Sequence, residues 1–162
     1  MRQDIKVDET KNRRRWIYKP GGLLLTQRRS EPTLSGIGEE MAEMLAKEID
    51  NTTVLNIKLN NSGNGFDVMQ FENGLENTTK IRLFESKPLN SNSVVLPNTG
   101  MGTQMGDRWI NANIQKMIRS TNADVKNIGN ILDTNFVNIE RYVFTVDKDL
   151  EQIIIFKLDI FN

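Results

Sequence analysis

Apolar positions recur along the chain at two different spacings, and these spacings predict its secondary structure. The segment Ser35–Ile49 has apolar residues at positions 37, 41, 44, 45 and 49, a helical repeat that follows a helix start signal. The same kind of repeat predicts a helix over Asp107–Arg119 and a shorter one over Asp124–Leu132. Runs rich in β-branched and aromatic residues predict strands at Val54–Leu59, Val68–Phe71, Lys80–Glu85, Ile139–Val146 and Gln152–Phe161.

Turn-forming residues indicate how these elements follow one another. Asn73-Gly74 is a hairpin dipeptide, so we expect the strands on its two sides to pair. The last two strands are separated by a short polar segment that begins with Asp147-Lys148-Asp149 and are also expected to form a hairpin. The segment Asn60–Gly65 predicts a loop with glycines at tight turns, and Leu89–Met101 predicts a polar loop able to close on a substrate.

Length and composition predict a single domain preceded by an arm. A chain of 162 residues can bury roughly 70% of the surface that its unfolded form exposes. We expect residues 1–34 to be an irregular or partly extended arm and residues 35–162 to be the domain. No apolar stretch approaches the roughly 20 residues of a membrane span, and the N-terminus lacks the apolar core of a signal peptide. The chain itself is therefore expected to be soluble.

The formal net charge is zero, but charge is unevenly distributed. Residues 1–29 contain nine Lys or Arg and three acidic residues, so they carry plus six and the rest of the chain minus six. Cations stand beside aromatic rings there, a combination suited to phosphate contacts and base stacking. These residues are Arg13, Arg14, Arg15, Trp16, Tyr18 and Lys19. The segment is either a substrate arm or a solvated leader that the tryptophan anchors on the core.

The residue types present restrict the chemistry. The chain has no cysteine, which excludes disulfides, thiolate zinc sites and a cysteine nucleophile. It has no histidine, which excludes imidazole ligands and histidine-based acid–base catalysis. Any hydrolytic reaction must then use carboxylates, lysine, hydroxyl groups and metal. An acidic body favours a divalent cation or a basic patch on a partner.

Two acids and a lysine have the spacing of a metal-dependent phosphodiesterase site. Asp67 precedes Glu85 by 18 positions, with the predicted hairpin between them, so paired strands can bring the two carboxylates together. Side chains alternate along a strand, which places Glu85 and Lys87 on one face. Carboxylates hold divalent ions such as Mg²⁺, and a nearby lysine can activate water or stabilise the phosphate. A solvated strand edge with alternating charges would show the same pattern.

Other polar residues are candidates for this site. Glu39 and Glu40 flank the start of the first helix. There the helix dipole stabilises a carboxylate, which could equally reach a metal ion. Gln104 lies near the start of the second helix and is either a ligand of phosphate and water or an ordinary surface group. Pro88 cannot donate a ladder hydrogen bond, so the strand before it should end there. Asp107 and Trp109 are expected to be structural. Arg141 is either a phosphate contact or a surface charge, and a surface charge is the favoured interpretation.

The order of these parts resembles the PD-(D/E)xK, or restriction-endonuclease-like, nucleases. The resemblance spans roughly Ser35 to Arg119, and the first signature acid follows Phe66 instead of the usual proline. More narrowly, the chain looks like nuclease toxin domains at the C-termini of bacterial polymorphic and contact-dependent growth inhibition toxins. The motifs that carry it are Gly38-Glu39-x-x-Ala42, Gly65-x-Asp67, Glu85-x-Lys87 and Gln104-Met105-x-x-x-Trp109-Ile110.

The resemblance implies an α+β (α/β) fold in which helices flank a mixed central sheet. It implies a metal-dependent endonuclease with Asp67, Glu85 and Lys87 as the signature, Glu39 or Glu40 as the helix acid and Gln104 as an auxiliary residue. The metal would be Mg²⁺, with Mn²⁺ or Zn²⁺ as alternatives. Such a domain would be delivered as part of a larger secreted or cell-surface toxin and would cut DNA or tRNA in the cytoplasm of a competing bacterium. A cognate immunity protein would neutralise it in the producer.

Two alternatives share this fold. One is a restriction or repair nuclease with the same active site. The other is a nucleic-acid-binding module that has lost catalysis. Genetic context separates the first from a toxin, and metal-dependent cleavage separates the second from both enzymes.

Overall fold

The computed structural model describes residues 3–6, 15–18, 53–55, 65–89, 93–147 and 152–158. Most of its strands form a six-stranded mixed sheet in the order β2-β10-β9-β5-β4-β3. These strands are β2 (Arg15–Tyr18), β3 (Thr53–Leu55), β4 (Val68–Phe71), β5 (Ile81–Ser86), β9 (Ile139–Asp147) and β10 (Gln152–Leu158). Smaller two-stranded sheets pair β1 (Gln3–Lys6) with β6 (Ser93–Leu96) and β7 (Asn98–Thr99) with β8 (Gly102–Thr103).

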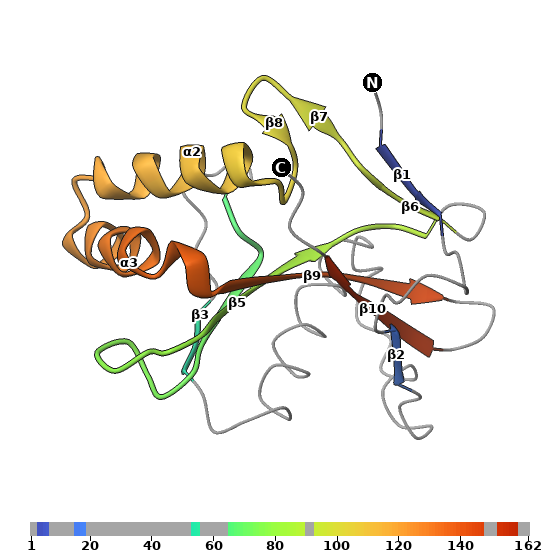
Figure 1. The fold of residues 1–162 in the computed structure, drawn as a ribbon, viewed down its shortest axis with the longest axis horizontal. Coiled ribbons are helices and arrows are strands. Elements are labelled where there is room, and N and C mark those ends of the chain that lie inside the picture. The colour runs from blue at the N-terminus through green and yellow to red at the C-terminus, as the bar shows by residue number, and fades with distance from the viewer. Residues whose placement is uncertain are drawn as a thin grey trace, which may run out of the picture.

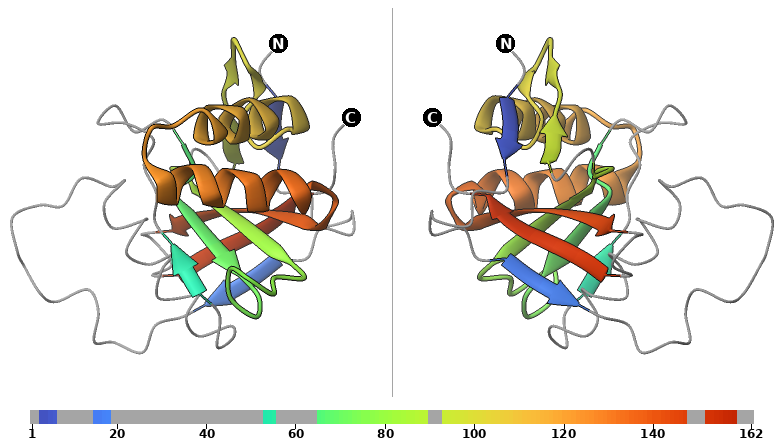
Figure 2. Two further views of the ribbon diagram at one scale, coloured as in Figure 1. Left: turned by 90° about the vertical axis from the view of Figure 1, so that its left-hand side faces the viewer. Right: turned by 90° about the vertical axis from the view of Figure 1, so that its right-hand side faces the viewer.

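The central strands β5 and β9 run parallel, whereas the other pairs in the large sheet are antiparallel. A parallel pair needs a crossover connection, and here it passes through α2 (Asp107–Ile118) and α3 (Ala123–Thr134). Both helices lie on the same face of the sheet (Figures 1 and 2). The short 3-10 helix η1 (Phe136–Asn138) then leads into β9. The fold is therefore mixed α+β, with two described helices and a mixed sheet, as the sequence predicted.

The core lies between this sheet face and the two helices. Alternation along β5 directs Ile81 and Leu83 towards the helices, where they are fully buried. Ile110, Ile114 and Met117 supply the buried stripe of α2 at helical spacing. The helices approach closely at Gly129 of α3, where a Cβ atom would lie 2.8 Å from Met117 Cβ. Asn122 caps α3 by accepting hydrogen bonds from two backbone N–H groups of its first turn.

Most of the predicted elements are confirmed within the described residues. The turn at Asn73-Gly74 has positive φ at both residues, 64° and 78°, as a tight hairpin turn requires. Strand β5 ends at Ser86, before Pro88, as predicted. The described part of the strand predicted at 54–59 ends at Leu55, and the predicted helix Ser35–Ile49 lies outside the described residues. None of the described helices has the length and hydrophobicity that a bilayer crossing needs.

One predicted segment is wrong, and another agrees with the expectation in its described parts. Leu89–Met101 was expected to be a polar loop, but it contains β6 and β7. The signal for β6 was the short run Val94-Val95-Leu96, in which the first and last residues are buried and the middle one is partly exposed. The arm 1–34 is partly extended, as expected, and its strand β2 pairs with β10 at the edge of the large sheet.

Candidate active site

The β4–β5 hairpin brings the two predicted acids to the same face of the sheet. Val68 pairs with Phe84 and Met69 with Leu83, so the register continues to place Asp67 beside Glu85. Both carboxylates then lie on the face that α2 and α3 cover. Asp67 Oδ2 accepts a hydrogen bond from the backbone N–H of Ser86 at 2.8 Å, which fixes it against the end of β5. The structure therefore brings together the two acids that the sequence paired.

Glu85 is the centre of the site. Its side chain is buried, and Oε1 accepts hydrogen bonds from Lys87 Nζ at 2.8 Å and from Gln104 Nε2. In the described part of the chain, its other oxygen, Oε2, has no hydrogen-bond partner, and the same holds for Gln104 Oε1. A buried polar atom without a partner is costly, so such atoms point to a ligand or function that the folded chain alone does not satisfy.

Lys87 is held beside Glu85 by both its backbone and its side chain. Its backbone N–H donates to Phe144 O at 3.0 Å, which extends the pairing of β5 with β9 by one hydrogen bond. Its ammonium forms an ion pair with Glu85 and is mostly shielded from solvent. The prediction that these two side chains share one face is confirmed. A cation in this position can orient an attacking water or stabilise charge on a phosphate.

Gln104 reaches Glu85 through a turn that the sequence did not reveal. It follows the β7–β8 hairpin, and its backbone N–H donates to Pro97 O at 2.9 Å. The next residue, Met105, has a φ of 66°, an unusual conformation for a side chain of this size, and is fully buried. The buried methionine anchors the turn, and the turn aims the amide of Gln104 at the carboxylate.

The aromatic contact between Phe66 and Trp109 fixes the helix side of the site. The two rings meet edge to face with their centroids 5.6 Å apart, and both are buried. Phe66 precedes Asp67 in the chain, and Trp109 belongs to the first turns of α2. The contact therefore joins the segment just before β4, which carries the first acid, to the helix that follows Gln104. The structural role predicted for Trp109 is confirmed.

The environment of Glu85 changes its acidity. Burial is the main cause that raises the pKa of Glu85 to about 7, and the neighbouring charge of Asp67 raises it further. Lys87 and Gln104 oppose this change because they stabilise the ionised form. Burial and the charge of Asp67 both disfavour the ionised form of Glu85. A divalent cation bound beside this carboxylate would strongly stabilise that ionised form.

This acidity predicts how the stability of the metal-free protein depends on pH. The folded-state pKa of about 7 lies above the ordinary value of 4.5, so Glu85 favours folding most below pH 4.5 and loses this contribution as pH rises through 7. The loss amounts to on the order of 3 kcal/mol, because each pKa unit is worth about 1.4 kcal/mol. Urea unfolding in EDTA across pH 5–8 should show a smaller decline for Glu85→Gln than for the wild type. Parallel pH profiles for the two proteins would contradict the prediction.

The arrangement fits a divalent cation held by Asp67 and Glu85. Carboxylate oxygens are the ligands that Mg²⁺ prefers, and Glu85 Oε2 is a buried oxygen without a partner among the described residues. The described residues contain no group of three or more acidic side chains that could surround a metal ion. Water and phosphate oxygens commonly complete the shell of Mg²⁺, so two carboxylates are a sufficient protein contribution. The candidate helix acids Glu39 and Glu40 lie outside the described residues.

The structure describes only some of the other basic residues considered in the sequence. Arg13, Arg14 and Lys19 lie outside the described residues, and only the backbone of Arg15 is described, in β2. The expectation that Arg141 is a surface charge is wrong. Its position in β9 opposite Leu83 directs it into the helix-covered face, where it is buried and pairs with Asp107. Asp107, which was expected to be structural, is the ion-pair partner of this buried arginine.

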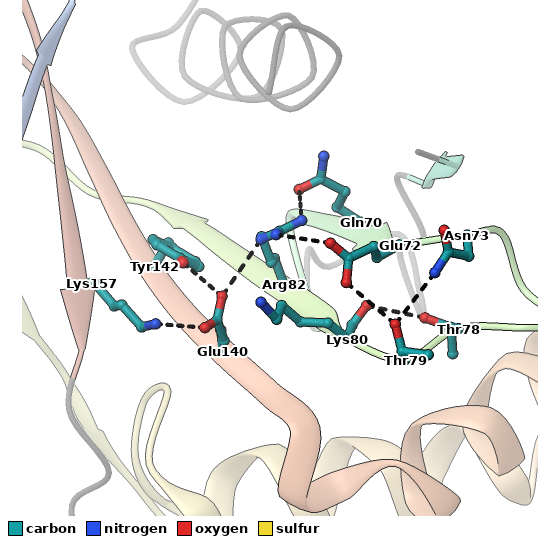
Figure 3. Close-up of polar contacts among 10 residues, drawn as sticks. All are labelled: Gln70, Glu72, Asn73, Thr78, Thr79, Lys80, Arg82, Glu140, Tyr142 and Lys157. Carbon is teal, nitrogen blue, oxygen red and sulfur yellow. Dashed lines mark hydrogen bonds and ion pairs between the residues drawn. The ribbon is translucent and has the colours of Figure 1, made fainter. Parts of the chain in front are cut away.

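A second polar cluster lies on the opposite face of the sheet (Figure 3). Glu140 accepts hydrogen bonds from Lys157 at 2.5 Å and from Tyr142 at 2.8 Å, and it forms an ion pair with Arg82. Burial alone would raise the pKa of Glu140, but Lys157 and Tyr142 lower it overall. The contrast with Glu85 is informative, because a carboxylate that the protein fully pairs behaves as a structural group.

Comparisons with known proteins give no relative. No family model, no curated protein and no solved structure matches the chain.

Proposed function

We propose that this protein is a metal-dependent nuclease of the restriction-endonuclease-like kind. The observation that carries the proposal is Glu85: a buried carboxylate with one oxygen held by Lys87 and Gln104 and the other without a partner in the described structure. It lies beside Asp67, near the end of β5 and two residues before the lysine. Acid, acid and lysine are the groups that phosphodiester hydrolysis needs in a chain without histidine or cysteine.

Each residue has a distinct part in this proposal. Asp67 and Glu85 hold the divalent ion, which supplies Lewis-acid stabilisation of the phosphate when bound. Lys87 orients the attacking water and offsets charge that develops on phosphorus. Gln104 keeps the Glu85 carboxylate in position and leaves its own carbonyl oxygen for water or substrate. The ion is Mg²⁺ on the basis of an all-oxygen donor set, with Mn²⁺ as a substitute.

The biological setting of the proposal comes from the motif resemblance. We infer a toxin domain that cuts DNA or tRNA in a competing bacterium and that an immunity protein neutralises in the producer. Coexpression with the product of a small neighbouring gene tests this part. Rescue of growth and formation of a stable complex are expected. Growth that needs no such partner would favour a restriction or repair enzyme.

Cleavage assays test the activity itself. The purified protein is incubated with plasmid DNA or with total cellular RNA, each in Mg²⁺ or in EDTA. We expect one of the two substrates to be cut in Mg²⁺ and both to stay intact in EDTA, because two carboxylates need the cation before they can act on a phosphate. Intact DNA and RNA in all samples would contradict the nuclease and favour a module that only binds nucleic acid.

A further inference from the structure

Arg141 is a buried cation whose hydrogen-bonding groups are mostly unused. Its side chain is 3% exposed, and its one ion pair in the described structure joins Nη2 to Asp107 Oδ1. The other two guanidinium nitrogens, Nε and Nη1, are buried without a hydrogen-bond partner in that part of the chain. Because unpaired buried donors are costly, a guanidinium in this state is suited to an anion with several acceptor oxygens.

The anion that now touches Arg141 stands at the start of a helix. Asp107 is the first residue of α2, and Gly106 before it provides no side-chain cap. The first N–H groups of a helix have no intrahelical partner and carry partial positive charge, so they attract anions. The start of α2 and the guanidinium of Arg141 are independent features that meet at the Asp107 carboxylate, which engages only Nη2 and leaves Nε and Nη1 open.

Asp107 marks where an oxygen of a larger anion would sit. Its side chain is 38% exposed, so this end of the ion pair opens to solvent although the arginine does not. A carboxylate leaves two of the guanidinium nitrogens without a partner, whereas a phosphate has more oxygens in a tetrahedral arrangement and can satisfy more donors. Gln104 lies three residues before Asp107 and donates a hydrogen bond to Glu85. Asp107 is therefore close to the candidate active site.

We propose that Arg141 and the start of α2 bind a backbone phosphate of nucleic acid, and that Asp107 fills this site in the free protein. The choice of nucleic acid as the ligand rests on the proposed nuclease function. Phosphate displaces the Asp107 carboxylate from Arg141 on binding. The two partners of one ion pair then have opposite effects on affinity, which a purely structural ion pair would not produce.

Binding in EDTA tests the site without any cleavage. The probe is a fluorescently labelled single-stranded oligonucleotide, read by anisotropy over a range of salt concentrations. Asp107→Asn is expected to bind roughly three- to tenfold more tightly, because it removes a competing negative charge. Arg141→Gln is expected to bind about tenfold more weakly and to lower the salt slope by about one, as loss of one phosphate contact should. Asp124→Asn, in the first turn of α3, is the matched control and should bind as the wild type does.

The outcomes separate the alternatives. If Arg141→Gln does not fold, Arg141→Lys replaces it in the test. The direction in which Asp107→Asn changes oligonucleotide affinity then decides whether the proposal holds. Equal or weaker binding by Asp107→Asn overturns the proposal. Inorganic phosphate is the second probe: variants that alter its binding but leave oligonucleotide binding unchanged overturn the assignment to nucleic acid. The protein could also cut neither DNA nor RNA while the two variants still change oligonucleotide affinity in opposite directions. That result would support the phosphate site and contradict the nuclease function.

Discussion

Replacement of Glu85 by glutamine is expected to abolish metal-dependent cleavage without loss of stability. The amide keeps the shape of the side chain but removes the negative charge that a divalent ion needs. Metal ions contribute several kcal/mol of transition-state stabilisation, and about 1.4 kcal/mol corresponds to a factor of ten, so we expect a loss of about three orders of magnitude in rate. The measurement is initial cleavage rate in Mg²⁺ on the substrate that the wild type cuts.

The stability of the same variant distinguishes this role from a structural one. Glu85 is buried, and one of its oxygens has no partner in the described structure, so the neutral amide should fold at least as stably at pH 8 in EDTA. Glu140→Gln is the matched control, because Glu140 also pairs with a lysine but lies on the opposite face of the sheet (Figure 3). The control should cut at the wild-type rate. Near-normal cleavage by Glu85→Gln would mean that the active site lies elsewhere.

Replacement of Lys87 by alanine is expected to stop cleavage while metal binding persists. Lys87 Nζ lies 2.8 Å from Glu85 Oε1, where its charge competes with a cation for the carboxylate. Its removal therefore leaves affinity for Mn²⁺ unchanged or higher. Its proposed action on water and phosphate is lost, and a positioned proton-transfer group contributes about 10²- to 10⁴-fold in rate. Calorimetric titration with Mn²⁺ and the cleavage assay together measure both effects.

The pair of variants gives a test that neither gives alone. Glu85→Gln should lose both metal affinity and cleavage, whereas Lys87→Ala should lose cleavage only. Lys157→Ala is the control for removal of a lysine, since Lys157 pairs with Glu140 on the far face at 2.5 Å. If Lys87→Ala also lost Mn²⁺ binding, Lys87 would be organising the acids instead of acting on the substrate.

Much of the site follows from local patterns in the sequence. Alternation along β5 determines that Glu85 and Lys87 share a face, and Asn73-Gly74 determines that this strand folds back on β4. With one face buried, the register is set, and Asp67 then lies beside Glu85. Pro88 ends the strand because it has no N–H to donate. These are properties of neighbouring residues, so a single sequence contains them.

Contacts between distant segments could not be read in the same way. The motif resemblance made Gln104 a candidate for the site, but no local pattern indicates that its amide meets Glu85, 19 positions away. This contact depends on the β7–β8 hairpin and on the positive φ of Met105. Arg141 alternates with apolar residues and was expected at the surface, but the parallel register of β9 with β5 turns it under α2.

By itself, then, the sequence determined which side chains share a strand face, where the tight turns lie and which catalytic chemistries the chain lacks. Only the tertiary structure decided which face is covered, which distant group meets each carboxylate and how far the pKa of Glu85 rises. The physical reason is that hydrophobic period and turn chemistry act over a few residues. Burial and charge pairing instead depend on the packing of strands and helices that are far apart in the chain.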